Sequence, residues 1–150
     1  MLKTKQIIDY LSQIKYFKGV YPIDCLPVFM EVPASIVINL EPHYMDGSHW
    51  VVVHIDKSRY AHYFDSFGRR PEGNILTFIE KNAPRGYTYN KIKFKANESI
   101  ACGYFCLLFI MMAQNQRKFY KIMAKCLHIE NEMVTYVLVK KLLCKNMSKS

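Results

Sequence analysis

The feature that most constrains the fold is an apolar run over residues 49–55, in which Trp, Val and Ile surround a single internal His. Such a run lacks the alternation of a half-exposed strand, so it predicts a strand buried on both faces near the centre of a sheet. A β-branched run over residues 35–40 predicts a second strand, and residues 60–64 a third that follows a short turn. Residues 87–94 alternate as a fourth strand would.

Helical periodicity surrounds these strands. Apolar residues recur at helical spacing after Thr4, which we expect to be the N-cap of a first helix that ends at Gly19. Two prolines within residues 20–27 predict an ordered loop. Residues 72–82 are predicted to form a helix. Three more helices are predicted later in the chain, over residues 102–113, about 116–127 and 132–143. We therefore predict one α+β domain over residues 1–150, with a central mixed β-sheet of about 4–5 strands packed by helices.

Charge is uneven along the chain. Of 21 basic and 12 acidic residues, eight basic and two acidic ones lie in the helical C-terminal segment, residues 113–150. A basic surface attracts polyanions without reading their sequence, although a solvated helix face explains such a segment equally well. No apolar stretch reaches eighteen residues and no secretory signal opens the chain, so we expect an intracellular protein with no membrane partner.

The five cysteines are free thiols in this interpretation, because their number is odd and none form a metal-type pair. Cys102 opens a predicted helix, where the helix dipole and outward N–H groups favour a thiolate and can stabilise an oxyanion. Gly103 leaves room for a substrate beside it. Cys106 lies one turn further on the same face and is expected in the core, as are the other three cysteines, Cys25, Cys126 and Cys144.

A base and an acid precede this cysteine in the chain. His49 opens the central strand beside a flexible turn, where an imidazole can take a thiol proton, and Trp50 can wall the site. Asp65 ends the strand that we expect to pair with it, so a hairpin would return its carboxylate to the imidazole. The other four histidines, His43, His54, His62 and His128, are expected to be structural or exposed.

Three ordered blocks resemble the adenovirus protease (adenain) family and, beyond it, the SUMO-specific proteases of the same clan. They are Gly-Ser-His-Trp at residues 47–50, Phe-Asp-Ser-Phe-Gly at 64–68 and Ser-Ile-Ala-Cys-Gly-Tyr-Phe-Cys at 99–106. The resemblance implies a papain-type arrangement in which His49 is the base, Asp65 orients it and Cys102 is the nucleophile at the start of a central helix. The glutamine that usually donates to the oxyanion is missing, and Asn97 is the substitute we predict.

The same resemblance implies a viral or mobile-element endopeptidase that processes precursor proteins, often at glycine-containing sites, in the host nucleus or the virion. We expect a monomer. No cofactor is required by the sequence, and no metal. The family implies activation by DNA or a short viral peptide. The basic segment is compatible with DNA, but residues 87–94 lack the cysteine to which the adenovirus enzyme bonds its peptide.

Other functions stay open. The triad would serve equally a deconjugating protease for a ubiquitin-like protein, or an acetyltransferase of the related bacterial effectors. A non-enzymatic nucleic-acid-binding domain would use the basic segment, with aromatic residues such as Phe119 and Tyr120 stacking on bases. A zinc site is the weakest alternative, because Cys102 and Cys106 have no second ligand pair at finger-like spacing.

Overall fold

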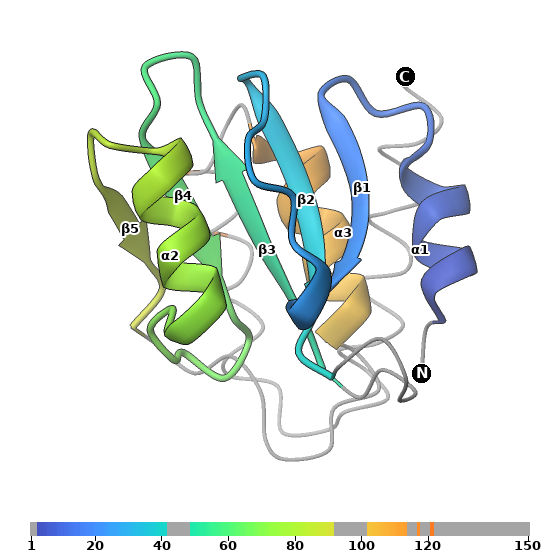
Figure 1. Ribbon diagram of the computed structural model, residues 1–150. Coiled ribbons are helices and arrows are strands. Elements are labelled where there is room, and N and C mark those ends of the chain that lie inside the picture. Colours follow the sequence, from blue (N-terminus) through green and yellow to red (C-terminus); the bar gives the residue numbers. More distant parts are fainter. Residues whose placement is uncertain (1–2, 42–48, 92–101, 114–116, 118–120, 122–150) are drawn as a thin grey trace.

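One mixed sheet organises the molecule. The computed structural model describes residues 3–41, 49–91, 102–113, 117 and 121. Its strands are β1 (Phe17–Pro22), β2 (Ala34–Asn39), β3 (Trp50–Ile55), β4 (Ala61–Phe64) and β5 (Tyr87–Tyr89), in the order β1-β2-β3-β4-β5 (Figure 1). The inner pairs β2–β3 and β3–β4 are antiparallel, whereas β1–β2 and β4–β5 are parallel. The predicted α+β class with a mixed sheet of about 4–5 strands is confirmed.

Helices cover both faces of this sheet. Helix α2 (Gly73–Asn82) lies on one face, and α1 (Thr4–Leu11) and α3 (Cys102–Met111) lie on the other (Figure 1). All six residues of β3 are buried, as its unbroken apolar run predicts. Alternate residues of β3 enter different cores: Val51 and Val53 pack with α2, and Trp50 and Val52 pack with α3.

Helix α3 is the central helix of the second core. Its residues from Phe105 to Ile110 are all buried, and an apolar helix with no polar stripe is typical of the interior. The ring of Phe109 stacks on that of Phe64 in β4, with 5.2 Å between centroids and an angle of 16°. An aromatic pair of this kind adds about 1 kcal/mol to the burial of two large side chains.

Two contacts fix the direction of α3 along the sheet. Near its beginning, the Cys106 Sγ lies 3.2 Å from the backbone oxygen of Trp50, the first residue of β3. At its other end, Ile110 borders the same pocket as His54, near the end of β3. Helix α3 therefore runs in the direction of β3, and the two elements begin at the same end of the sheet.

The N-terminal region differs from its prediction. Lys3, not Thr4, is the N-cap of α1, and the helix ends at Leu11 instead of Gly19. Residues 17–22 form an edge strand, where the end of the first helix and the start of a loop over residues 20–27 were predicted. Parallel pairing with β2 satisfies their backbone groups, and Pro22 lies at the strand end where its missing N–H costs little. Gly19 lies at a shift in the register, with φ of +132°, a conformation that glycine adopts without strain.

Several predicted elements fall on residues that the structure does not describe. These are the helix over about residues 116–127 apart from Arg117 and Lys121, the helix over residues 132–143, most of the basic segment 113–150, and the part of the fourth predicted strand beyond residue 91. The single-domain assignment stays a prediction. Within the described residues, no helix is both long enough and apolar enough to span a membrane.

Candidate active site

His49 and Asp65 are joined by a short hydrogen bond at one end of the sheet. His49 Nε2 lies 2.7 Å from Asp65 Oδ1, and both side chains are almost fully buried, at 11% and 2% exposure. A charge-assisted bond of this length, shielded from water, holds an imidazole strongly. It also leaves Nδ1 as the basic nitrogen of the neutral ring, because Nε2 must carry the proton that it donates to the carboxylate.

The β3–β4 hairpin creates this contact. The two strands are antiparallel, with Val52 opposite Phe64. The residue before β3 and the residue after β4 therefore come to the same end of the sheet. Those residues are His49 and Asp65, sixteen positions apart in the chain. The structure thus brings together two residues singled out from the sequence, whose catalytic roles remain predictions.

Asn90, which the sequence analysis did not single out, holds the backbone of Asp65. Its Oδ1 accepts from the Asp65 N–H at 3.0 Å, and its Nδ2 donates to the Asp65 carbonyl. The carboxylate also accepts the Phe67 N–H at 2.8 Å, on the oxygen that faces His49. Because Asn90 directly follows β5, which runs parallel to β4, it reaches the same sheet end as Asp65. The position of Asn90 at the end of this strand was the signal that could have identified it.

Phe67 is a second residue that the sequence analysis did not place in the site. Its ring stacks on the His49 imidazole, with 4.4 Å between centroids and an angle of 28°. The Arg69 guanidinium lies 4.9 Å from the centre of the same ring. Phe67 therefore limits rotation of the imidazole about its bond to Asp65, and the arginine brings a positive charge close to the site.

Two buried polar atoms next to this pair have no hydrogen-bond partner among the residues that the structure describes. They are the Trp50 Nε1 and the Ser66 Oγ, whose residues are 1% and 0% exposed and directly follow His49 and Asp65 in the chain. An unsatisfied buried donor or hydroxyl costs about 1–3 kcal/mol. Trp50, the first residue of β3, lies in the α3 core.

The start of α3 lies at the same sheet end as His49. Cys102 is the first residue of this helix, one turn before the Cys106 that contacts the backbone of Trp50. At 1.5 Å per residue, that turn is about 6 Å along the axis toward the end where His49 lies. Gly103 is buried in the same first turn, and Asn97 lies outside the described residues.

Two other cysteines are described. Cys106 is fully buried, which confirms its predicted place in the core. The prediction for Cys25 was wrong, because it is exposed beside Asp24 in the short 3-10 helix that follows β1. Desolvation and the neighbouring Asp24 carboxylate raise the pKa of Cys25, so exposure does not make this thiol reactive. Cys126 and Cys144 lie outside the described residues.

The described histidines other than His49 lie within strands, as expected: His54 in β3 and His62 in β4. His43 and His128 lie outside the described residues. Among the residues with a described position, no three His, Cys, Asp or Glu side chains gather closely enough to hold a metal ion. The arrangement that can carry chemistry is therefore the buried imidazole–carboxylate pair beside the start of α3.

Comparisons with known proteins bear on the fold. No family model matches the chain, and no curated protein does. The central domain of the uncharacterized Lpg1148 protein from Legionella pneumophila aligns over 99% of this chain and 98% of its own, with 16% identity and a TM-score of 0.55. This likeness shows a shared fold and says nothing of activity. The ASFV pS273R protease aligns over 68% of this chain and 38% of its own, with 18% identity and a TM-score of 0.39, a distant likeness to a viral protease.

Proposed function

We propose that this protein is a cysteine endopeptidase in which Cys102 is the nucleophile, His49 the general base and Asp65 the residue that orients the base. The observation that carries the proposal is the 2.7 Å bond between His49 Nε2 and Asp65 Oδ1, at the sheet end where α3 begins. A helix start favours a thiolate, and an imidazole held by a carboxylate is the usual partner of such a thiol. The three sequence blocks that resemble adenain contain these same residues.

The tautomer of His49 determines which nitrogen takes part in proton transfer. With Nε2–H donating to Asp65, Nδ1 takes the proton of the Cys102 thiol while the sulfur attacks the carbonyl carbon of the substrate. The tetrahedral oxyanion collapses, the C–N bond breaks, and the imidazolium returns its proton to the leaving amine. Water then attacks the thioester and gives one proton to Nδ1. The C–S bond breaks, Nδ1 returns this proton to the sulfur of Cys102, and the carboxylic acid leaves.

Backbone N–H groups at the start of α3 are the oxyanion donors in this mechanism, with the Asn97 amide as the proposed side-chain donor. Such donors stabilise the negative charge that develops on the attacked oxygen, and each contributes about 3 kcal/mol. The indole of Trp50, which is 1% exposed, excludes water from the inner side of the site.

The substrates we propose are precursor proteins of a virus or mobile element, cleaved at glycine-containing sites in the host nucleus or the virion. Activation by DNA through the basic C-terminal segment, or by a viral peptide, belongs to the same proposal. It is supported by the three sequence blocks and by the +9 formal charge of the chain.

Thiol labelling tests the proposal without knowledge of a substrate. The intact protein is treated at pH 7 with limiting iodoacetamide, and each adduct is located by mass spectrometry in the wild type, His49→Ala and Cys102→Ser. We expect Cys102 to react first in the wild type and to lose this advantage in His49→Ala. Cys25 is an internal control, because it is exposed and the pKa of its thiol is raised.

Equal, slow labelling of Cys102 and Cys25, unchanged by His49→Ala and by added DNA, would contradict the proposal. A selective reaction justifies the second measurement, hydrolysis of peptides that contain Gly-Gly or Gly-Ala, with Cys102→Ser as the inactive control. An acetyl-donor requirement in place of hydrolysis would identify an acetyltransferase with the same residues.

A further inference from the structure

A pocket of about 760 Å³ lies at the end of the sheet opposite to His49 and Asp65. It opens between the loop after α1, the beginning of β2, the β3–β4 turn and the C-terminal end of α3. His54 in the pocket and His49 are five residues apart on one extended segment, or about 17 Å. The volume is that of a site for a small organic ligand.

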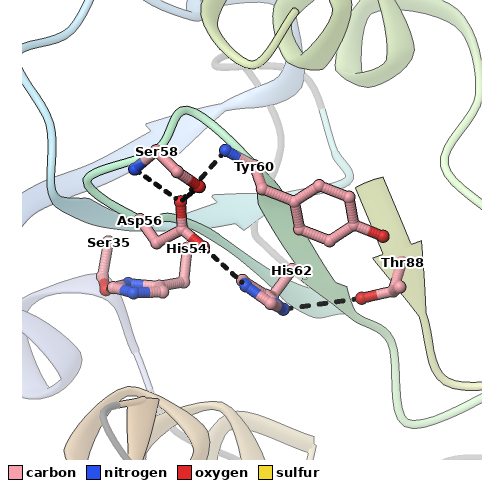
Figure 2. Close-up of polar contacts among 7 residues, drawn as sticks. All are labelled: Ser35, His54, Asp56, Ser58, Tyr60, His62 and Thr88. Carbon is pink, nitrogen blue, oxygen red and sulfur yellow. Dashed lines mark hydrogen bonds and ion pairs between the residues drawn. The ribbon is translucent and has the colours of Figure 1, made fainter. Parts of the chain in front are cut away.

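A row of polar residues crosses the sheet at this level. Ser35, His54, His62 and Thr88 are direct cross-strand partners on β2, β3, β4 and β5 (Figure 2). They continue the sheet face whose neighbouring row, Val37, Val52 and Phe64, packs in the α3 core. The sheet surface thus changes from apolar to polar where α3 ends, and Ser35 and His54 line the pocket there.

The two polar residues that line this part of the pocket are buried and paired. Ser35 Oγ lies 2.6 Å from His54 Nδ1, and the residues are 2% and 4% exposed. Burial and the neighbouring His62 lower the pKa of His54 to about 4, despite the opposing effect of Asp56. His54 is consequently a neutral imidazole at physiological pH, and the pocket carries no buried positive charge.

Apolar side chains supply a large part of the wall. Ile14 contributes from the loop after α1, Pro33 from the approach to β2, and Ile110, Met111 and Ala113 from the end of α3. An apolar wall with a few convergent polar groups is the usual composition of a small-molecule site.

The charges at the rim are mostly positive. Lys15 and Lys57 are exposed, and neither has an ion pair among the described residues, although Lys15 lies over the ring of Tyr16. Asp56, the acidic residue of the pocket, is held in the β3–β4 turn. Its Oδ1 accepts from the Ser58 N–H, the Ser58 hydroxyl and the Tyr60 N–H, and its Oδ2 lies 3.3 Å from His62 Nε2 (Figure 2). The acceptor atoms of Asp56 are therefore used within the turn and by His62, and the two lysines are the cationic side chains of the described pocket lining.

We infer that this pocket binds a small amphipathic organic anion, with its apolar body against Ile110 and Met111 and its anionic head at Lys15 and Lys57. A neutral polar interior favours this orientation, because a buried charge on the ligand would find no opposite charge near His54. The inference does not depend on the proposed peptidase activity.

The test is an NMR titration of the full-length ¹⁵N-labelled protein with octanoate, and with octylammonium and octanol as matched probes. We expect saturable shifts of the amides of Lys57, Ser58 and Met111 with octanoate, at an affinity at least about tenfold higher than for octylammonium. Lys57→Glu should weaken octanoate binding by about tenfold, whereas Lys81→Glu, an exposed lysine of α2, should leave it unchanged.

A second variant keeps the inference falsifiable if Lys57→Glu disturbs the turn. Ala113→Trp places a large side chain on the half-buried pocket wall, and should abolish the shifts while the melting temperature stays near that of the wild type. Equal binding of octanoate and octylammonium, shifts that do not saturate, or shifts centred on the exposed Val28 and Phe29 would each overturn the inference.

Discussion

The two ends of the β3–β4 hairpin each contain a histidine and an aspartate, but the protein treats them differently. At one end, His49 donates to Asp65 at 2.7 Å, and Asn90 and the Phe67 N–H hold the aspartate in place. At the other end, His54 pairs with the Ser35 hydroxyl. The Asp56 carboxylate there accepts hydrogen bonds from its own turn and contacts His62. Residue type is the same at both ends, and the partner differs.

The partner decides what each imidazole can do. A carboxylate stabilises an imidazolium, so His49 has the environment of a base that must carry a proton during a reaction. A hydroxyl and a second imidazole do not, and the pKa of His54 falls to about 4. In the two proposals, the first end transfers a proton and the second is a neutral binding surface.

Exchange of the aspartates for asparagine separates the two ends most sharply. Asp65→Asn should slow alkylation of Cys102 at pH 7 by about thirtyfold, toward the rate of an ordinary thiol, because the amide cannot stabilise the imidazolium. Asp56→Asn is the matched control, with the alkylation rate expected to stay unchanged. Equal effects of the two substitutions would remove the functional distinction between the ends.

Acid should reveal the burial of His54. The native histidine takes its proton only near pH 4, whereas the unfolded one does so near 6.5, so the unfolded state binds more protons between these values. Stability is fully present above pH 6.5 and is lost as the pH falls toward 4, by up to about 3 kcal/mol. Urea unfolding across this range should show a smaller loss in His54→Gln. If the stability of His54→Gln fell with pH as steeply as that of the wild type, His54 would not be the source of the loss.

Two buried asparagines distinguish support of the site from support of the fold. Asn90→Ala should cost about 2 kcal/mol and also slow Cys102 alkylation several-fold, because the N–H and C=O of Asp65 both lose their hydrogen bonds to the Asn90 side chain. Asn82→Ala, which removes the bonds to Met30, Val28 and Phe78, should cost as much stability without a change in alkylation. Denaturant unfolding and the labelling rate are measured on both variants.

The aromatic neighbours of the histidines give a smaller contrast. Phe67→Leu removes the ring stacked on His49 and should lower stability by about 1 kcal/mol and the alkylation rate by two- to fivefold. Tyr60→Leu removes the ring that meets His62 edge-on at 5.2 Å, and the alkylation rate is expected to stay the same. A change for Tyr60→Leu alone would reverse the proposed roles of the ends.

The smallest expected effect is a gain in stability. Ser66→Ala deletes a fully buried hydroxyl, next to Asp65, that has no hydrogen-bond partner within the described part of the chain, and should stabilise the protein by about 1 kcal/mol. The measurement is the urea midpoint at constant m-value. A loss of stability would show that the hydroxyl has a role that the structure does not display.

Much of the architecture was determined by the sequence itself. The sequence of β3 requires burial on both faces, because His54 is its one polar side chain and the Val, Ile and Trp side chains point to both faces. A central strand with helices on each side follows from that. The hairpin spacing likewise predicted His49 and Asp65 at one sheet end, since antiparallel strands return the chain to its starting edge. The local sequence pattern determines the central strand and the hairpin because the strands that pair are close in the chain.

Only the tertiary structure decided the rest. Pairing with β2 turned residues 17–22 into a strand, and the parallel β5 brought Asn90 to Asp65 across 25 positions of chain. The Phe67 stack and the Ser35–His54 pair also join residues whose local patterns carry no sign of each other. Such contacts depend on strand order and register, which single-strand periodicity does not encode, so the sequence supplies the reactive groups and the folded sheet selects their partners.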